Sequence, residues 1–499
     1  MKILVLEHPR VPSEKRFNDI ASTPLWSCLM GGYAAASLEQ NGFDTIFLDH
    51  TAPGACFDAT RDKIMSLNPD LLCVNAVYFW EHTPQLFTLF STLKTLGFSG
   101  HITLFGFFPS LVYRKILHQC DPVDSVAVGE FEHTLVELAK ALEKKRSIES
   151  IEGLATRSCL SHTKHCTRRP EKNPDQFAFP KRGGIEETET ILASRGCYNH
   201  CSFCPIPSFY NQGSLWKGRS PENITKEIQG LVDQGTKDFY FVDPNFIGPG
   251  KLGKKRTMDL MDLLTPMGIK FGMETRPQDL DDEILEQLVK AGFESLLMGV
   301  ESGSAAILNQ INKSSKAAVA SRAISLCRNH GIEPEIGFLM FVPDSRLDDL
   351  FENMDFLIKN NLLDRLDRTA NLLSHTQIVL AGTSGYETFE RDNRLKKTGI
   401  FGFEGDVNFS DPKVKWVAKR VTFACHTILK NMSDSKSPLF WKNENLNVSQ
   451  KANAFLVDLF FTLLSQAKNI SELPFSDIRP GENEIQDQIK AIITPPKNH

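Results

Sequence analysis

The sequence has little excess charge of either sign and no long apolar run. Its 499 residues include 56 Lys and Arg against 61 Asp and Glu, a formal net charge of −5. Nucleic-acid-binding domains usually carry a basic surface, so this balance argues against a nucleic-acid partner. No stretch reaches the apolar length needed to cross a bilayer, and the first residues, MKILVLEHPR, turn polar too soon for a signal peptide. We therefore expect a cytoplasmic protein without a membrane span.

Cysteine is also sparse. Eleven cysteines in a chain without an export signal indicate reduced thiols rather than a disulfide framework. Three of them, Cys197, Cys201 and Cys204, nevertheless fall within the eight residues CYNHCSFC, after an apolar run that predicts a strand. The hydrophobic and charged fractions, 41% and 23%, are those of an ordinary globular protein, and the length predicts two or three domains.

Residues 1–147 alternate short apolar strands with amphipathic helices. Such strands predict a parallel sheet with helices on both faces, which is a doubly wound, flavodoxin-like α/β domain. Ligands of these sheets bind at the carboxyl ends of the strands, and here those ends carry Asn75, Gly106, Pro109, Gly129 and Glu130. The five strands are predicted at residues 2–7, 45–49, 71–77, 101–106 and 125–129.

Residues 148–187 break this rhythm with a polar stretch that contains proline and predicts a linker carrying a small hairpin. Cys159, His162, His165 and Cys166 lie in it, but their spacing matches no standard zinc pattern, so a plain hairpin is favoured over a metal clip. Two short basic runs, at 143–146 and 251–256, lie at the edges of predicted helices, where we expect solvated lysines.

From residue 188 to about 390 the alternation resumes with strands predicted at 188–194, 238–243, 269–275, 294–302, 335–343 and 375–381. Six parallel strand–helix units predict a (β/α)6 partial TIM barrel, with its chemistry on loops at the carboxyl ends of the strands. The first barrel helix has Ser220 as its N-cap, Pro221 at its first position and Gly235 beyond its end. Residues 391–499 predict a helical C-terminal region.

Three thiolates on one tight loop at the end of the first barrel strand indicate a metal centre. Thiolates select iron–sulfur clusters, zinc or copper(I). A structural zinc would need a fourth ligand from a second knuckle, and none follows, while His200 is awkwardly adjacent to Cys201. Three ligands can hold three irons of a cubane and leave the fourth open to a substrate. We therefore predict that Cys197, Cys201 and Cys204 bind a 4Fe–4S cluster rather than act as buried structural cysteines.

The loop CYNHCSFC resembles the signature of the radical S-adenosylmethionine (SAM) superfamily. FVDPNF (241–246), METRP (273–277), GVESGS (299–304) and GFLMFVP (337–343) resemble further elements of that family at successive strand ends. The resemblance implies a 4Fe–4S cluster whose open iron binds SAM, and a reductant such as flavodoxin or ferredoxin. It places Phe203 against the adenine, and Glu274, Arg276, Glu301 and Ser302 at the ribose and methionine parts. Asp243 either faces the substrate or a cofactor, or caps a helix.

The first domain resembles the cobalamin-binding class of this superfamily, which includes methyltransferases and the anaerobic porphyrin-ester cyclase. Residues 104–142 carry its glycine, proline and glutamate pattern at Gly106, Pro109, Gly129, Glu130 and Glu132, together with Asp124, Val126 and Thr134. The D-x-H-x-x-G signature that supplies a histidine to cobalt is absent, and DHTAPG (49–54) is interpreted as a turn. Cobalamin bound without a histidine ligand and a domain that no longer binds cobalamin are both compatible with this sequence.

The leading hypothesis is a cobalamin-dependent radical SAM methyltransferase that acts on an unactivated carbon or phosphorus centre of a small-molecule substrate. The same residues support an oxidative cyclase or a rearrangement enzyme that transfers no methyl group. A non-enzymatic iron–sulfur electron carrier or sensor would need a fourth protein ligand, and the remaining cysteines are dispersed. No residue pattern names the substrate.

Overall fold

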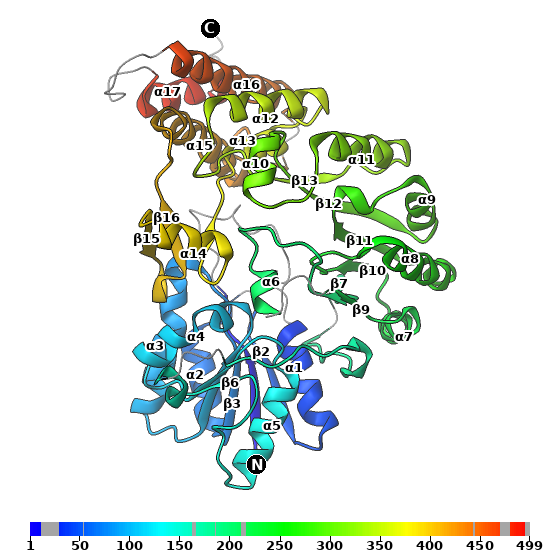
Figure 1. Cartoon of the computed structure of the whole chain (residues 1–499), viewed down its shortest axis with the longest axis vertical. Helices are drawn as coiled ribbons and strands as arrows, with labels where there is room; N and C mark the ends of the chain where they lie inside the picture. Colours follow the sequence, from blue (N-terminus) through cyan, green and yellow to red (C-terminus); the bar gives the residue numbers. More distant parts are fainter. Residues whose placement is uncertain are drawn as a thin grey trace. The chain divides into compact units, whose positions relative to one another are not determined.

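The computed structural model describes residues 1–10, 29–52, 54–161, 166–184, 186–210, 216–442, 445–469 and 480–494 (Figure 1). The chain forms two compact units. The first comprises Met1–Leu296, Asn329–Glu333 and Val379–Asp406, and the second comprises Leu297–Arg328, Pro334–Ile378 and Val407–His499. This division does not follow the predicted domain borders, which stay predictions. None of the described helices combines the length and the apolar character that crossing a membrane requires.

The first unit opens with a sheet of strand order β2-β1-β3-β4-β5-β6. The five predicted strands are confirmed as β1 (Ile3–Glu7), β2 (Thr45–Asp49), β3 (Leu71–Asn75), β4 (His101–Phe105) and β5 (Ser125–Ala127), and they pair in parallel. The register sets Ile3 beside both Thr45 and Leu71. This is the order of flavodoxin-like sheets, whose ligands bind at the carboxyl ends of the strands.

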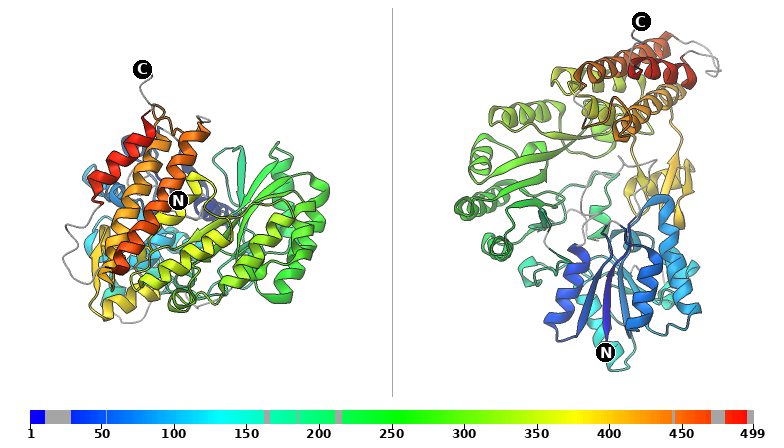
Figure 2. Two further views of the ribbon diagram at one scale, coloured as in Figure 1. Left: turned by 90° about the horizontal axis from the view of Figure 1, so that it is seen from above. Right: turned by 180° about the vertical axis from the view of Figure 1, so that it is seen from behind.

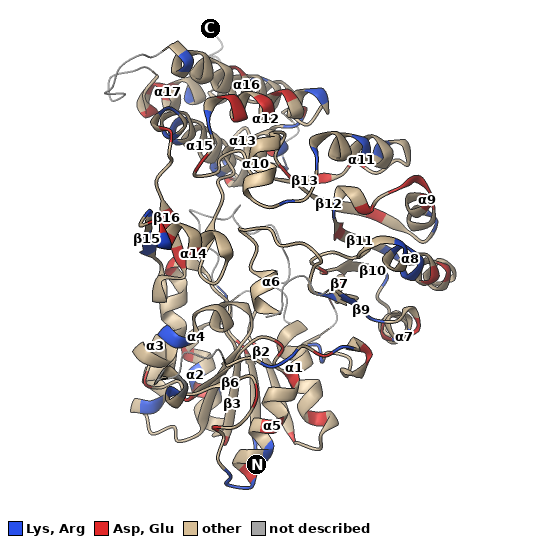
Figure 3. Cartoon of the chain, in the orientation of Figure 1, with Lys and Arg blue, Asp and Glu red and all other residues tan. Residues whose placement is uncertain are grey.

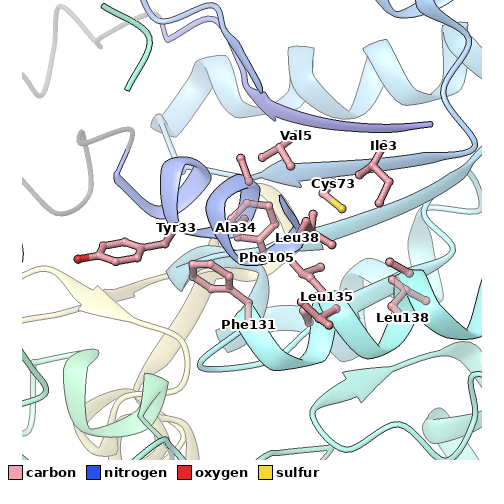
Figure 4. Close-up of a cluster of buried hydrophobic side chains, with 14 of the residues drawn as sticks. Ile3, Val5, Tyr33, Ala34, Leu38, Cys73, Phe105, Phe131, Leu135 and Leu138 are labelled. Atoms are coloured by element: carbon pink, nitrogen blue, oxygen red, sulfur yellow. The ribbon is translucent and has the colours of Figure 1, made fainter. Parts of the chain in front are cut away.

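Helices α1 (Leu29–Gln40) and α5 (Glu132–Glu143) cover one face of this sheet, where their apolar side chains meet those of β1, β3 and β4 (Figure 4). The other crossovers carry α2 (Phe57–Leu67), α3 (Thr83–Thr95) and α4 (Phe107–Gln119). Each fully buried large apolar side chain contributes about 1.5–3 kcal/mol, so this core holds the sheet and the loops at its carboxyl edge. Its labelled members are Ile3, Val5, Tyr33, Ala34, Leu38, Cys73, Phe105, Phe131, Leu135 and Leu138.

The predicted linker hairpin is not found in the described part of residues 148–187. Instead β6 (Leu154–Ala155) adds an antiparallel edge strand to β5, and the short helices η3 (Arg157–Ser161) and η4 (Pro174–Gln176) follow. A strand of two residues whose partner lies in the preceding domain leaves no periodic signal of its own, which explains the error. His162 and His165 of the weighed metal clip lie outside the described residues.

The barrel strands begin with β7 (Thr188–Ile191), β10 (Asp238–Phe241) and β11 (Lys270–Thr275), which pair in parallel within the first unit. β12 (Phe293–Glu301) runs from the first unit into the second, where it pairs in parallel with β13 (Glu335–Phe338). The intervening helices are α7 (Pro221–Val232), α8 (Gly250–Leu264), α9 (Asp282–Lys290), α10 (Ala305–Gln310) and α11 (Ala317–Asn329). The predicted N-cap is confirmed, because Ser220 Oγ accepts a hydrogen bond from the Asn223 N–H at 3.2 Å.

The sixth predicted barrel strand is wrong as a full strand. Where this strand was predicted, the second unit has a single isolated parallel bridge between Phe341 and Thr376. In the first unit Val379–Leu380 forms β14, which pairs antiparallel with β16 (Glu404–Val407), and the Ala381 N–H donates to the Phe403 carbonyl at 2.8 Å. The backbone groups of residues 379–381 are therefore taken by a local antiparallel sheet.

Residues 392–411 contain no α-helix, contrary to the prediction, because β15 (Leu395–Thr398), the short 3-10 helix η7 (Ile400–Gly402) and β16 follow α14 (Ser384–Arg391). Helices then begin, with α15 (Pro412–Ser433), α16 (Leu446–Asn469) and α17 (Glu482–Ile493). In the second unit α15 packs on α13 (Leu366–Ser374), α16 and α17, and α16 also packs on α12 (Leu347–Lys359) (Figure 2). The predicted helical C-terminal region thus starts about twenty residues later than expected.

Candidate functional site

The three clustered cysteines lie on the segment 196–205, here named the cluster loop, which follows β7 and the short strand β8 (Ser194–Arg195). All three side chains are partly exposed and none forms a disulfide. The Cys204 N–H donates to the Cys201 carbonyl at 3.1 Å, and Asn199 Nδ2 lies 2.9 Å from Cys201 Sγ. Phe203, the predicted adenine contact, lies on the same loop and is also partly exposed.

The donor set fits an iron–sulfur cluster. Within the described residues, no three His, Cys, Asp or Glu side chains are grouped to hold a single metal ion. A cubane takes its three thiolates on three different irons, so its cysteines need not converge on one point. Soft thiolates that reach solvent on one short loop are the ligands that such a cluster requires.

Tyr198 anchors the cluster loop to the ends of the neighbouring barrel strands. Its hydroxyl donates to Asp279 Oδ1 at 2.5 Å, and Asn245 Nδ2 donates to Asp279 Oδ2 at 3.0 Å. The Arg276 guanidinium, which is buried, lies 4.9 Å from the centre of the Tyr198 ring. The predicted SAM contact Arg276 therefore lies against the cluster loop. Sequence reasoning missed Tyr198 and Asp279, although Asn245 stands in the quoted segment FVDPNF.

Of the two roles predicted for Asp243, the helix cap is wrong, and the contact with a substrate or a cofactor stays a prediction. Its side chain is completely buried, and its Oδ1 accepts a hydrogen bond from the Ser194 N–H at 2.5 Å, while Oδ2 has no hydrogen-bond partner. The N-cap of the following helix α8 is Pro249, so Asp243 caps no helix there. Burial raises the pKa of Asp243 to about 7, although backbone hydrogen bonds and nearby arginines lower it in part. Asp243 holds the backbone just ahead of the cluster loop.

Arg256 has a related role and differs from Lys251 and Lys255 of the same basic run, which are exposed as predicted. The run opens α8, where Lys and Arg gather in Figure 3. Arg256 Nη2 donates to the Ala193 carbonyl at 2.6 Å, and its Nε donates to the Arg219 carbonyl at 2.7 Å. Burial lowers its pKa to about 10, although Asp243 raises it. This arginine is an internal support of β8 rather than a solvated side chain.

Glu274, a predicted SAM contact, is the second carboxyl group near the strand ends with a raised pKa. It occupies the penultimate position of β11, and among the described residues its carboxylate makes no hydrogen bond or ion pair. Burial raises its pKa to about 8, and the nearby Asp243 carboxylate adds to the rise. An acid with unused hydrogen-bonding capacity at this position is suited to a polar ligand.

These two acids predict a dependence of stability on pH. Both have a folded-state pKa above the ordinary value, so the folded chain binds more protons than the unfolded chain between about pH 4 and pH 8. Their contribution to the free energy of unfolding is therefore largest below about pH 4 and falls as the pH rises to about 8. Urea denaturation of the metal-free protein should show this decline, and the double variant Asp243→Asn, Glu274→Gln should flatten it. An unchanged slope in the double variant would contradict this assignment; exposed Asp62→Asn is the control.

Glu301 and Ser302, the remaining predicted SAM contacts, lie in the second unit. Glu301 Oε1 lies 2.7 Å from Lys313 Nζ in a largely buried ion pair, and its backbone φ is +71° at a register shift between β12 and β13. Ser302 Oγ donates to Asn353 Oδ1 at 2.7 Å, and the Gly303 N–H donates to the same oxygen. Lys313 and Asn353 therefore set the positions of both predicted contacts. Neither was identified from the sequence.

At the carboxyl edge of the first sheet (residues 75–80, 106–110 and 129–132), Asn75 is buried and donates to Glu7 Oε1 at 2.9 Å. Gly106 has a φ of +106°, and a Cβ there would meet Asn75 Oδ1 at 2.4 Å, so only glycine fits. Gly129 also has a positive φ, +79°, and Pro109 lies buried in the first turn of α4. The predicted glycines thus let the backbone turn closely at this edge, while the Asn75 side chain is used inside the protein.

Helix α6 (Ile206–Phe209), which follows the cluster loop, lies on this carboxyl edge within the first unit. The Phe209 ring packs on Phe107 with 4.1 Å between ring centres, and a Cβ on Gly129 would lie 3.0 Å from the Phe209 carbonyl. Phe107, Phe209 and Tyr210 form a small buried cluster. The cluster loop and the predicted cobalamin edge are thereby brought together in one compact unit.

Glu130, a predicted cobalamin contact, forms ion pairs with Arg195, which directly precedes the cluster loop, and with Lys217. Its Oε1 lies 3.4 Å from Arg195 Nη1 and 3.5 Å from Lys217 Nζ, and Arg195 Nη2 lies 2.6 Å from Glu132 Oε1. Burial by itself would lower the pKa of Arg195, but Glu132 and Glu130 raise it. The Glu130 carboxylate is therefore paired inside the protein, and its contact with cobalamin stays a prediction.

The histidines of this edge have partners within the protein. His8 Nε2 accepts from the Val77 N–H at 3.1 Å and its Nδ1 lies 2.7 Å from the Pro9 carbonyl, while burial and Arg10 lower its pKa to about 3. His50 Nδ1 lies 2.7 Å from Thr60 Oγ1. In DHTAPG, Asp49 Oδ1 accepts from the Thr51 N–H at 3.0 Å, a local turn, as predicted. A cobalt ligand from His8 or His50 is not supported.

Comparison with known proteins agrees with this geometry. Residues 191–357 match the family model described as the radical SAM superfamily. The chain therefore contains a radical SAM domain, which implies a 4Fe–4S cluster and SAM. The fold is similar to that of the cobalamin-dependent SAM radical enzyme OxsB with aqua-cobalamin and SAM bound, with a TM-score of 0.71 and 18% sequence identity. The match covers 98% of this chain and 78% of the OxsB chain.

Two curated relatives extend the comparison. The uncharacterized methyltransferase PH0819 of Pyrococcus horikoshii is 24% identical over 372 residues, 72% of this chain and 78% of the relative. The anaerobic magnesium-protoporphyrin IX monomethyl ester cyclase of Rubrivivax gelatinosus is also 24% identical, over 66% of this chain and 60% of the cyclase. The chain thus spans less than two thirds of the cyclase.

Proposed function

We propose that this protein is a cobalamin-dependent radical SAM methyltransferase that acts on an unactivated carbon or phosphorus centre of a small molecule. The observation that carries the proposal is the contact of α6 with the carboxyl edge of the first sheet, since it joins the cysteine loop to the edge where such a sheet binds its ligand. The OxsB fold and the methyltransferase relative support it.

When bound, the cofactors supply the methyl group, the carbon radical and the methyl carrier. The chain supplies binding, orientation and exclusion of water. The three cysteine thiolates would hold the cluster, and within the same unit Arg276 and Glu274 would bind polar parts of SAM. Glu301, in the second unit, is retained as a predicted SAM contact. Cobalamin would lie along the backbone near Gly106 and Gly129, where neither glycine presents a side chain.

Aromatic side chains would keep water from this edge. Tyr78, Phe108 and Phe403 pack together with ring centres 4.7–5.2 Å apart, and the Tyr78 hydroxyl contacts the Glu404 carboxylate. Phe403 and Glu404 come from the segment after α14, so the loop that follows the barrel packs on the first sheet within the first unit. Exclusion of water from this edge would suit reactive radical species.

The competing function is a radical SAM cyclase or rearrangement enzyme, favoured by the equal identity to the porphyrin-ester cyclase. The test is anaerobic reconstitution of the full chain with iron, sulfide and hydroxocobalamin, followed by incubation with methyl-labelled SAM, a flavodoxin or titanium(III) citrate, and metabolite extract from a deletion strain. We expect hydroxocobalamin to remain bound through gel filtration, and S-adenosylhomocysteine, 5′-deoxyadenosine and a labelled product to form together.

The products separate the alternatives. Deoxyadenosine without S-adenosylhomocysteine or a labelled product would contradict methyl transfer and favour the cyclase or rearrangement. A reduced cluster whose electron paramagnetic resonance (EPR) spectrum does not respond to SAM would instead favour an electron carrier or sensor.

A further inference from the structure

A buried charge network connects the cluster loop to the first sheet. It consists of Arg195, Lys217, Glu130 and Glu132, and is here named the Arg195 network. The side chains of Arg195, Glu130 and Glu132 are 6%, 5% and 1% exposed, so their charges are almost fully removed from water. Two positive and two negative side chains balance in formal charge.

The position of the network in the chain is specific. Arg195 lies two residues before Cys197, and β8 pairs it directly with Lys217 of β9 (Lys217–Gly218). Glu130 directly follows Gly129 in the loop after β5, and Glu132 is the first residue of α5. The network therefore joins the start of the cluster loop to the loop on which we place cobalamin.

The guanidinium of Arg195 is held in one orientation. It lies 4.0 Å from the centre of the Phe177 ring and 5.0 Å from that of Tyr33, while its two terminal nitrogens reach separate glutamates. A planar fork with aromatic neighbours is a property of arginine that lysine cannot reproduce. The backbone of β8 is thus fixed in distance and in direction.

Stability alone does not account for the network. Buried ion pairs are often no more stabilising than apolar side chains of the same volume. Glu132 Oε2 is also buried without a hydrogen-bond partner, which costs free energy. Definition of a unique geometry is the remaining benefit of such an arrangement.

We propose that Arg195 is a positioning residue, which fixes the cluster loop on the carboxyl edge of the first sheet through Glu132 and Glu130. Only one measurement in its test, the affinity for hydroxocobalamin, rests on the proposed function. Loss of the network leaves the cysteines in place, so the cluster still assembles, but the cluster loop loses its fixed position relative to the loop 129–132.

The test compares Arg195→Lys and Glu132→Gln with a matched control. Glu189 pairs with Arg182 at 2.6 Å in a similarly buried contact of the same unit. The Glu189 side chain is 5% and the Arg182 side chain 13% exposed, and Glu189→Gln removes one charge there. Each full-length protein is reconstituted anaerobically with iron and sulfide. Iron content, the EPR spectrum of the reduced cluster and hydrogen–deuterium exchange over residues 190–205 and 126–136 are measured first, without cobalamin.

Arg195→Lys and Glu132→Gln should keep a full complement of iron but exchange about tenfold faster over both segments than Glu189→Gln. Their affinity for hydroxocobalamin should fall about ten- to a hundredfold, the range found when residues that orient a site are replaced. Exchange over 190–205 like that of the control would overturn the proposal. If the unsubstituted protein binds no hydroxocobalamin, the proposed function fails, while the exchange comparison still decides the role of Arg195. Glu132→Gln, which conserves volume, keeps the test open if Arg195→Lys does not fold.

Discussion

Replacing Cys197, Cys201 or Cys204 with alanine should abolish reductive cleavage of SAM, a loss of at least about a thousandfold, because each thiolate holds one iron of the cluster. The reconstituted variants should lose most of their iron and sulfide, and the visible absorption of the cluster should disappear. Product analysis for 5′-deoxyadenosine after incubation with SAM and titanium(III) citrate measures the activity.

The matched control for these variants is Cys56→Ala. Cys56 is exposed and lies before α2, outside the cluster loop. It should keep the iron content and the activity of the unsubstituted protein. A Cys197, Cys201, Cys204 triple alanine variant that retained full iron and sulfide would show that the cluster binds elsewhere, and would remove the basis of the proposed function.

The cluster loop and the parallel strands of the two large sheets could be predicted because their signals are local. Continuous apolar strands and the C-x3-C-x2-C spacing are readable within windows of ten residues, and the N-cap Ser220 is only three residues from its partner. The sixth barrel strand was wrong for a complementary reason. Its apolar pattern is compatible with pairing to β13 or to β16, and the pattern does not say which neighbour forms the hydrogen bonds.

The roles of buried polar side chains could not be predicted, because their partners lie far away in the sequence. Glu130 was expected at a ligand, but Arg195, 65 residues later, binds it. Asp243 was expected at a substrate or a helix end, but the Ser194 N–H, 49 residues earlier, takes its carboxylate. In both cases the sequence indicates a polar residue at a strand end but does not reveal its partner within the fold. Glycines near these sites were easier to interpret from the sequence. A positive φ at Gly106 favours glycine at this position whatever side chains surround it.

Lys313→Met should destabilise the second unit by about 3–5 kcal/mol, the usual cost of leaving one member of a buried ion pair without its partner. Lys313 and Glu301 side chains are 6% and 11% exposed, so water cannot replace the lost ammonium group. The space for this pair depends on Gly299, where a Cβ would lie 2.8 Å from Glu301 Oε1 and 2.9 Å from Lys313 Nζ. Urea denaturation measures the change. The control is Arg365→Met in the same unit, an exposed partner of Glu335, which should change stability by under about 1 kcal/mol.

The double variant Lys313→Met, Glu301→Gln separates the structural role of Glu301 from its proposed contact with SAM. Removing both charges should restore most of the lost stability, because no unpaired charge stays buried. Equilibrium dialysis of the cluster-loaded protein should nevertheless show SAM binding that stays about tenfold or more weaker, since the Glu301 carboxylate is absent. If stability and SAM affinity both recover, the Glu301 carboxylate has only a structural role at the register shift between β12 and β13. If neither recovers, the ammonium group of Lys313 has a further partner, and the ion pair does not account for its burial.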